Sequence, residues 1–181
     1  MSDLTFRRYD APAARTIRDL VAEIHHDAYG EKDGFSSDEA FMRRYDAYTA
    51  QDDFDLVLAE QDGEPVGQAW GWPLDAATSW WSGLLAEPEP GFTREDGRRT
   101  FALSEIMVRQ AATGQGIARA LHTELLQARP EQRATLLVRP SNTVAYRAYE
   151  RWGWRPVAKL RPAWPDAPTF DVLILRLPIP R

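Results

Sequence analysis

The chain has 181 residues, with 22 basic and 27 acidic side chains, a net charge of −5 at pH 7, seven Trp and no Cys. The absence of cysteine excludes a disulfide scaffold and a cysteine-ligated metal site. No apolar run is long enough to span a membrane, and the negative charge argues against nucleic acid bound through an overall positive field. Since the first ten residues also lack a secretory signal, we expect one cytoplasmic domain over residues 1–181, with neither membrane nor nucleic acid as a partner.

Positive charge is concentrated in residues 109–155, which carry eight Arg against three Glu. This segment therefore has a net charge of +5, and the remainder of the chain carries −10. A basic block within an acidic protein can attract a polyanionic ligand locally. Solvated helix faces explain the same pattern without a ligand, so charge alone leaves both interpretations open.

The first 50 residues predict one strand followed by two amphipathic helices. Residues Leu4–Tyr9 alternate as in a strand, and Asp10 can cap a helix with an apolar stripe. This stripe consists of Ile17, Leu20, Val21, Ile24 and Ala28. Ser36 and Glu39 resemble a capping box, which predicts a second helix through Tyr45.

Two strands and a long irregular stretch follow. Residues Phe54–Glu60 and Pro65–Trp72 flank the dipeptide Asp62-Gly63, which readily forms the turn of a hairpin. Residues 73–100 contain three Pro and three Gly and give no clear element. Long irregular stretches are functional, disordered or wrongly assigned. The adjacent Trp80 and Trp81 argue against simple disorder.

The second half alternates strands with helices. The predicted elements are the strand Phe101–Val108, a helix with Ile117, Leu121 and Leu125 on one side, the strand Ala134–Val138, the helix Asn142–Trp152, and the strands Pro156–Leu160 and Thr169–Leu177. The loop between the last two strands, residues 161–168, is rich in Pro. The interleaved elements predict one layered α/β or α+β structure.

The turn after the strand Phe101–Val108 carries the clearest chemical signal. It contains Gly114 and Gly116 directly before a helix, so several main-chain N–H groups and the positive helix end converge on one point. Phosphate is the natural occupant of such a place, although a tight turn without ligand has the same pattern. A dinucleotide-binding fingerprint fits poorly, because Arg119 stands where its third glycine belongs.

Two motifs together resemble the GCN5-related N-acetyltransferase (GNAT) family. Glu-Ile-Met-Val (residues 105–108) followed by Thr-Gly-Gln-Gly-Ile-Ala (residues 113–118) is similar to the family's acetyl-coenzyme A signature. Residues 139–154 are similar to its second motif, an Asn that opens a helix ending in Tyr-x-x-x-Gly-aromatic. The resemblance covers nearly the whole chain and implies an α+β GNAT fold, a mixed, mostly antiparallel sheet with a splayed central strand and helices on both faces.

The resemblance implies acetyl-coenzyme A as co-substrate and names the residues that hold it. The implied coenzyme-binding residues are Ile106, Met107, Val108, Thr113, Gly114, Gln115, Gly116, Ile117, Ala118, Asn142, Ala145 and Tyr149. The family usually has Arg or Gln at the position of Thr113, which predicts weaker side-chain contact with phosphate while the main-chain amides still bind. Asn142 can serve as a helix N-cap as well as a pantetheine ligand.

Two residues are the implied catalytic groups. Glu105 is the candidate general base, since an alkylammonium must lose a proton before its nitrogen attacks; an edge position on a strand is the alternative explanation. Tyr149 is the candidate acid that protonates the departing thiolate, and its alternative is a core aromatic. Since both motifs overlap the basic segment, we expect several of its arginines to contact phosphates.

We expect the acceptor site to be formed by the two N-terminal helices, residues 73–100 and the loop 161–168, together with Glu105. Its candidate residues are Glu105 and the aromatic side chains Tyr29, Phe35, Trp72, Trp80, Trp81 and Trp164. Aromatic faces attract cations and stack on flat rings, which favours an amine on an apolar body. No metal is expected, because the three His have no metal-ligand spacing.

The sequence therefore predicts direct transfer of acetyl to a primary amine of a small molecule. The alternatives are a peptide or protein amine as acceptor, and a coenzyme-binding module without catalysis. The acceptor, the use of longer acyl groups and the oligomeric state, a homodimer included, stay open.

Overall fold

The computed structural model describes residues 3–180, and the chain falls into two compact units. The first unit contains the described residues up to Trp72, Leu103–Arg129 and residues 179–180, and the second contains Pro73–Ala102 and Pro130–Pro178. The boundary falls within strand β4 (Thr100–Val108), so that this strand belongs to both units. The single domain expected over residues 1–181 stays a prediction.

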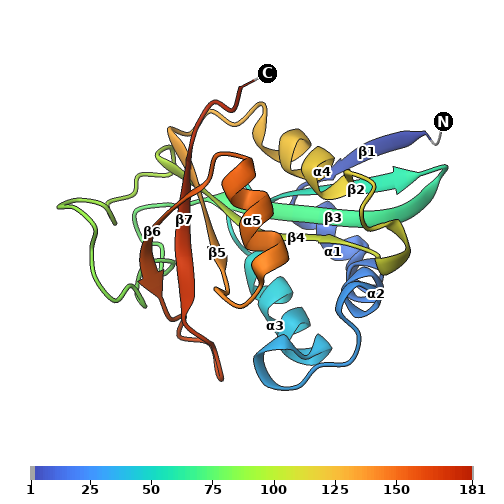
Figure 1. The fold of residues 1–181 in the computed structure, drawn as a ribbon, viewed down its shortest axis with the longest axis horizontal. Helices are drawn as coiled ribbons and strands as arrows, with labels where there is room; N and C mark the ends of the chain where they lie inside the picture. The colour runs from blue at the N-terminus through green and yellow to red at the C-terminus, as the bar shows by residue number, and fades with distance from the viewer. Residues whose placement is uncertain (1–2, 181) are drawn as a thin grey trace. The chain divides into compact units, whose positions relative to one another are not determined.

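The first unit begins with a strand and a group of helices (Figure 1). In chain order its elements are β1 (Leu4–Tyr9), α1 (Ala11–Thr16), α2 (Arg18–Tyr29), the short 3-10 helix η1 (Gly34–Ser36), α3 (Asp38–Tyr48), β2 (Asp55–Gln61), β3 (Glu64–Pro73), the second part of β4, the 3-10 helix η2 (Gln110–Ala112) and α4 (Ile117–Leu126). Strands β1, β2 and β3 pair in antiparallel order, as the predicted hairpin requires. The turn residues Asp62 and Gly63 both have positive φ, which confirms the expected hairpin geometry.

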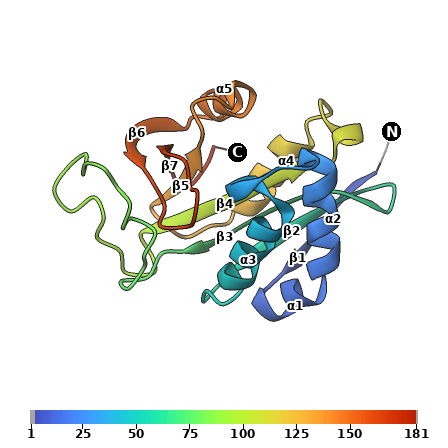
Figure 2. The same cartoon turned by 90° about the horizontal axis from the view of Figure 1, so that it is seen from below.

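Helices cover both faces of this sheet. Along β3, Gln68 donates to the carbonyl of Val21 in α2, and Trp70 packs edge-on against Tyr45 of α3. Gly67, one residue before Gln68, faces the opposite side, where an added Cβ would lie 3.1 Å from a methyl group of Leu121 in α4. Side chains alternate between the two faces of a strand, so β3 has one face toward α2 and α3 and the other toward α4. Figure 2 shows α1, α2 and α3 together on one side of β1 to β3.

The second unit contains the remaining strands and one helix. Its elements are the first part of β4, then β5 (Arg133–Val138), α5 (Thr143–Arg151), β6 (Arg155–Leu160) and β7 (Phe170–Arg176). Strand β7 pairs in antiparallel fashion with both β5 and β6. The whole strand order is β1-β2-β3-β4-β5-β7-β6, a seven-stranded mixed sheet.

Strand β4 is the splayed strand of this sheet. Its parallel pairing with β5 comprises three residue pairs, from Thr100 with Arg133 to Ala102 with Thr135. The following β4 residues, Leu103–Val108, have no register partner on β5. The predicted α+β GNAT-type architecture, mostly antiparallel with one splayed strand, is confirmed.

Two local predictions are wrong: the continuity of the first helix and the N-cap residue of α3. The first expected helix is broken at Ile17, where α1 ends and α2 begins, and the Thr16 hydroxyl bonds the Ala13 carbonyl beside the break. Such side-chain bonds compete with the helical ladder. The N-cap of α3 is Ser37 in place of Ser36, because the extended backbone of Ser37 lets its hydroxyl accept from the Ala40 amide.

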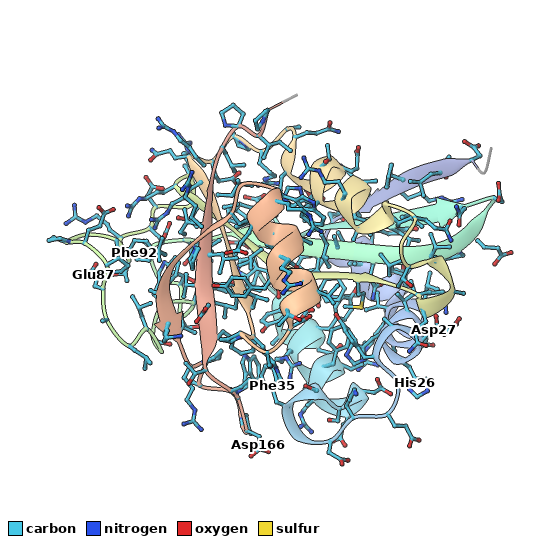
Figure 3. All side chains as sticks on the ribbon, viewed as in Figure 1. His26, Asp27, Phe35, Glu87, Phe92 and Asp166 are labelled. Carbon is cyan, nitrogen blue, oxygen red and sulfur yellow. The ribbon has the colours of Figure 1, made fainter. Side chains whose placement is uncertain are left out.

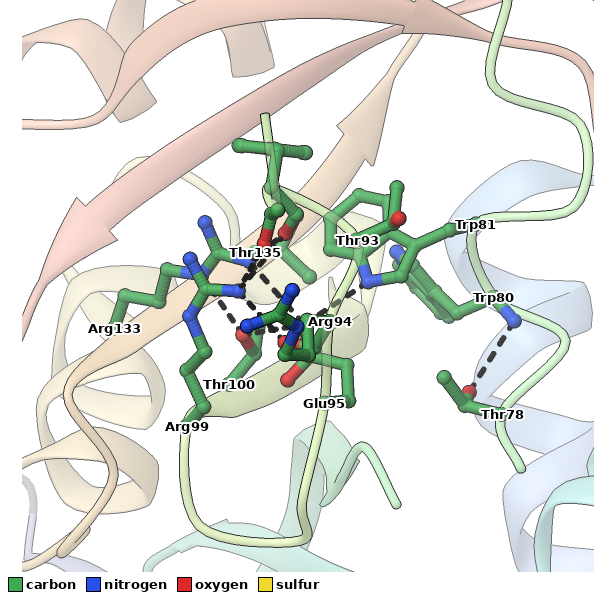
Figure 4. Close-up of polar contacts among 12 residues, drawn as sticks. Thr78, Trp80, Trp81, Thr93, Arg94, Glu95, Arg99, Thr100, Arg133 and Thr135 are labelled. Carbon is green, nitrogen blue, oxygen red and sulfur yellow. Dashed lines mark hydrogen bonds and ion pairs between the residues drawn. The ribbon is translucent and has the colours of Figure 1, made fainter. Parts of the chain in front are cut away.

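Residues 74–99 form no helix or strand of their own but are ordered around a buried carboxylate (Figure 4). Glu95 Oε1 accepts from Trp81 Nε1 at 3.0 Å, from Thr100 Oγ1 at 2.8 Å and from Arg133 Nη2 at 3.2 Å. Arg133 also lies over the ring of Phe92 at 4.5 Å. Side-chain hydrogen bonds to Glu95, and not regular secondary structure, therefore hold this segment in place.

None of the helices in residues 3–180 is long and apolar enough to cross a membrane.

Candidate active site

The glycine loop after β4 leads into an uncapped helix. Gly114 and Gly116 have φ of 77° and 80°, the left-handed region that favours glycine. Gly116 is the N-cap of α4, so no side chain occupies the first amides of this helix. By contrast, Asp10, Ser37 and Asn142 cap their helices through side-chain oxygens. The exposed N-terminus of α4 is therefore chemically suited to an anionic ligand.

Side-chain hydrogen bonds of Thr113 and Gln115 hold the glycine loop in place. The Thr113 hydroxyl donates to the Gln110 carbonyl at 2.8 Å, and Gln61 at the end of β2 donates to the side chain of Gln115 at 3.0 Å. The Thr113 side chain is thus used within its own turn. This geometry agrees with the expectation that the main-chain amides, not this side chain, are the groups that bind phosphate.

The residues of β4 divide between two faces of the first unit. Gln68 donates to the sulfur of Met107 at 3.2 Å, so Met107 lies on the face covered by α2 and α3. Glu105, two residues earlier, has its side chain on the same face, while Ile106 and Val108 alternate to the α4 face. The strand thus carries its carboxyl toward α2 and α3, and its main chain leads directly into the glycine loop.

Glu105 is an unusual carboxyl. Burial raises its pKa to about 7, and the positive charge of Arg44 opposes part of that rise. Within residues 3–180 its carboxyl has no hydrogen bond or ion pair, and the side chain keeps partial contact with solvent. A carboxyl with this pKa exchanges its proton near neutral pH, as a general base must.

Arg44 of α3, whose charge acts on Glu105, was not found from the sequence. Its guanidinium stacks over the ring of Phe35 at 3.9 Å, and Nη1 donates to the Phe35 carbonyl at 2.8 Å. Arg44 is only 6% exposed. The overlooked signal is its position, since Phe41, Arg44 and Tyr45 share the buried side of the helix.

A second polar cluster joins α2 to the start of α3. His25 Nδ1 and His26 Nδ1 each lie 2.7 Å from a different oxygen of Asp38. His25 is buried and stacks on Phe41 at 3.7 Å, whereas His26 lies on the outer side of α2 (Figure 3). As expected from the sequence, the two rings do not both face inward. Burial would raise the pKa of Asp38, but the contacts with His26 and His25 outweigh it and lower that pKa. The contact with Asp38 raises the pKa of His26, while burial lowers the pKa of His25.

The aromatic residues expected at the acceptor site have different surroundings. Tyr29 is 41% exposed and lies 5.2 Å from His25, and Phe35 is half-buried under Arg44. Trp72 is buried beside Tyr48 and Phe54, so it contributes to the core of the first unit.

In the second unit, Trp81 is buried and donates to Glu95, as Figure 4 shows, which gives it a packing role. Trp80 and Trp164 are partly exposed. Figure 3 shows Asp166, on the loop that also carries Trp164, at the edge of the molecule's second unit. The assignment of these residues to the acceptor stays a prediction.

Tyr149 and Asn142 belong to the second unit. Tyr149 is 9% exposed, with its ring edge-on to Trp152 at 5.6 Å and to Trp154 at 6.2 Å. Asn142 accepts from the Ala145 amide at 3.3 Å and caps α5, which confirms its N-cap role. Helix α5 is tied to β7 by Tyr146, which donates to Asp171 at 2.9 Å. This fixes the helix that presents Tyr149.

Comparison with known proteins identifies the family. The model of the acetyltransferase (GNAT) family matches residues 18–154, well over half of the chain. The chain belongs to the acetyltransferase (GNAT) family. No curated protein matches the chain.

Solved GNAT structures share the fold at low sequence identity. The ribosomal-protein-S18-alanine N-acetyltransferase from Escherichia coli has a TM-score of 0.65 and 16% identity, over 99% of this chain and 97% of the other. A GNAT acetyltransferase from Elizabethkingia anophelis, solved with acetyl-CoA, has a TM-score of 0.61 and 14% identity, over 96% and 98%. The aminoglycoside N-acetyltransferase AAC(6')-Iy, solved with CoA, has a TM-score of 0.56 and 15% identity, over 87% and 91%.

Within this GNAT chain, three arginines of the basic segment have internal roles. Arg109 bonds the Pro65 carbonyl and pairs with Glu23 of α2. Arg129 pairs with Asp55, and Arg133 with Glu95. Three of the eight arginines in this segment therefore have partners inside the protein. Arg147, Arg151 and Arg155 are exposed and are the better candidates for the expected phosphate contacts.

In the part of the chain that the structure describes, no group of three or more His, Asp or Glu side chains is arranged to hold a metal ion.

Proposed function

We propose that this protein transfers acetyl from acetyl-coenzyme A to a primary amine of a small molecule, by direct attack within a ternary complex. The observation that carries the proposal is Glu105, a carboxyl with pKa raised to about 7 on the strand that leads into the exposed glycine loop. A general base tuned toward neutral pH and an uncapped helix N-terminus are what an amine acetyltransferase requires.

Each candidate residue has one chemical task in this reaction. Glu105 takes a proton from the acceptor ammonium, directly or through water, so that the neutral nitrogen can attack the thioester carbonyl carbon. A main-chain N–H of β4 stabilises the developing oxyanion. As the carbon–sulfur bond breaks, the Tyr149 hydroxyl gives its proton to the thiolate. The acetyl group ends on nitrogen, and the thiol is released.

Different segments of the chain bind different parts of the coenzyme. The amides from Thr113 to Ala118 bind the pyrophosphate, and the main chain of Ile106 to Val108 binds the thioester and pantetheine. Asn142 and Ala145 lie at the start of α5 and contribute to the pantetheine contacts. Support comes from the left-handed glycines and from the absence of a side-chain cap on α4.

A peptide or protein amine is the second candidate acceptor. It is favoured by the fold shared with a ribosomal-protein-S18-alanine N-acetyltransferase, whereas the shared fold of an aminoglycoside N-acetyltransferase favours a small molecule. Acetylation of a peptide N-terminus at a higher kcat/KM than any small amine would decide for this second candidate.

The deciding experiment measures thiol release from acetyl-coenzyme A with a panel of small amines and peptides. The proposal expects release that depends on amine, with mass-spectrometric detection of an N-acetyl product. Coenzyme binding by calorimetry without release from any amine or peptide would identify a binding module without catalysis.

The role of Tyr149 has its own test. We expect Tyr149→Phe to keep coenzyme affinity and to lower kcat by about 10- to 100-fold, since one proton transfer is lost. Tyr146→Phe is the matched control, because Tyr146 lies on the same helix and its hydroxyl bonds Asp171. If Tyr149→Phe keeps the full kcat, Tyr149 is not the acid.

A further inference from the structure

Arg44 has a place in the fold that packing alone does not favour. It is 6% exposed, on the side of α3 that also buries Phe41 and Tyr45. A buried cation loses hydration, so this position requires groups that compensate for the charge. An exposed neighbour, Arg43, pairs with Glu39 one turn earlier and shows the usual surface arrangement.

The guanidinium of Arg44 is held in one orientation. The Phe35 ring covers one of its faces at 3.9 Å, and the Phe35 carbonyl accepts from Nη1 at 2.8 Å. Stacking and a fixed hydrogen bond limit the rotation of the planar fork before any ligand binds. A pre-organised guanidinium loses little further entropy on pairing with a carboxylate.

Arg44 and Glu105 belong to the same face of the first unit. The side chain of Glu105 shares its face of the sheet with Met107, Gln68 and Trp70, and Trp70 packs on Phe41 and Tyr45 of α3. The charge of Arg44 also acts on the carboxyl of Glu105 and on the ring of His25. The acceptor side of the unit thus contains one candidate base and one fixed cation.

We propose that Arg44 is a specificity-determining residue that binds a carboxylate of the acceptor, so that the preferred acceptor is a zwitterion such as an amino acid. The inference rests on the proposed function, in which the acceptor amine lies at Glu105. An amine there and a carboxylate at Arg44 match the two charges of the site. An acceptor with a second positive charge near its amine is repelled by Arg44.

The test compares three amines that differ at one group. Phenylalanine has an α-carboxylate, phenylalaninamide a neutral amide, and phenethylamine neither; the aromatic body suits the rings of Tyr29 and Phe35. Rates are compared as kcat/KM for the neutral amine, because the three amines differ in basicity. We expect phenylalanine to be preferred by about 10- to 100-fold, the usual range for a hydrogen-bonded charge.

Variants of Arg44 test whether this residue causes the preference for phenylalanine. Arg44→Gln should remove the preference, mainly through a higher KM for phenylalanine, and Arg44→Lys should keep part of it. Arg43→Gln, the matched surface control, should change nothing. 3-Phenylpropanoate, which has the carboxylate without the amine, should inhibit the wild type competitively and fail to inhibit Arg44→Gln.

The outcomes separate this inference from the proposed function. No thiol release with any amine contradicts the proposed function. Release with equal kcat/KM for the three amines, or with phenethylamine preferred, overturns the role of Arg44 and leaves the acetyltransferase intact. Circular dichroism shows whether Arg44→Gln folds; if it does not, the wild-type selectivity and the Arg44→Lys variant decide. The inference is rejected if Arg44→Lys keeps the full preference for phenylalanine and 3-phenylpropanoate does not inhibit the wild type.

Discussion

Glu105 and Glu95 are two glutamates in secluded positions, and their surroundings differ in almost every respect. Glu95 is buried in the second unit and accepts three hydrogen bonds at one oxygen, including one from the Arg133 guanidinium. Glu105 in the first unit has no such donor among the described residues, and burial raises its pKa to about 7. Arg44 supplies charge to Glu105 but is itself bonded to Phe35.

The comparison shows that the surroundings of a glutamate determine whether it stabilises the fold or can take part in proton transfer. A carboxylate that accepts three hydrogen bonds at one oxygen ties together the segments that supply the donors, and here it holds an irregular segment in place. A carboxyl that is desolvated without donors costs stability but can exchange a proton near neutral pH. Glu95 therefore has the properties of a structural group, and Glu105 those of a reactive one.

The largest expected effect is on turnover in Glu105→Gln. Loss of the base should lower kcat by about 100- to 10,000-fold, while coenzyme affinity stays within a few-fold of the wild type. Steady-state kinetics and calorimetry measure the two quantities. The identical change at the other site, Glu95→Gln, is the control, and equal turnover losses in both variants would remove the distinction.

The next effect is on stability in Glu95→Gln. Removing the negative charge leaves Arg133 buried without its counterion, which should cost about 3 kcal/mol of unfolding free energy. Urea unfolding followed by circular dichroism measures this loss. The same measurement on Glu105→Gln should show no destabilisation near pH 8, and a comparable loss there would contradict the assignment of a reactive carboxyl.

A smaller effect is the pH dependence of stability contributed by Glu105. Its folded pKa of about 7 lies above the ordinary value of 4.5, so the folded state binds the proton more tightly than the unfolded state. This contribution is present below the unfolded pKa and is lost as pH rises from 4.5 toward 7. Glu105→Gln should therefore raise Tm relative to the wild type at pH 8 more than at pH 4.5, as thermal unfolding at both values would show. A pH-independent difference would mean that Glu105 is not protonated near neutral pH.

The same titration should govern activity in the opposite direction. Because the base acts deprotonated, kcat/KM of the wild type should fall as pH drops below about 7.

The smallest effect concerns one donor to Glu95. Trp81→Phe keeps the ring that packs on Phe92 but removes the indole N–H, and should lower the unfolding free energy by about 1 kcal/mol without changing kcat. Chemical unfolding and steady-state kinetics measure the two quantities. A loss of activity without loss of stability would instead place Trp81 at the acceptor, as the sequence suggested.

Sequence patterns recovered most elements, because their signals are local. The strand and helix periodicities, the Asp62-Gly63 turn and the capping Asn142 depend on residues close in the chain. The break at Ile17 and the Ser37 cap were missed, since each depends on one competing hydrogen bond. Within the candidate site, the glycine loop was predictable for the same reason.

Long-range contacts decided the rest. Glu95 meets Arg133 across 38 positions, so nothing in residues 73–100 alone reveals the hydrogen bonds that order them. Trp72 and Trp81 could not be separated from the other tryptophans, because burial depends on the elements that pack around a side chain.

By itself, the sequence determined the family motifs, Glu105 and Tyr149 as candidate catalytic groups, and the loop before α4. The motifs and the loop follow from residue type and short spacing, and the two catalytic roles are what the resemblance to the family implies. Only the tertiary structure decided that Glu105 is desolvated and subject to the charge of Arg44, and that Glu95 Oε1 accepts from three donors. The physical reason is that the state of a carboxyl depends on solvent access and neighbouring charge, which arise when distant segments pack together.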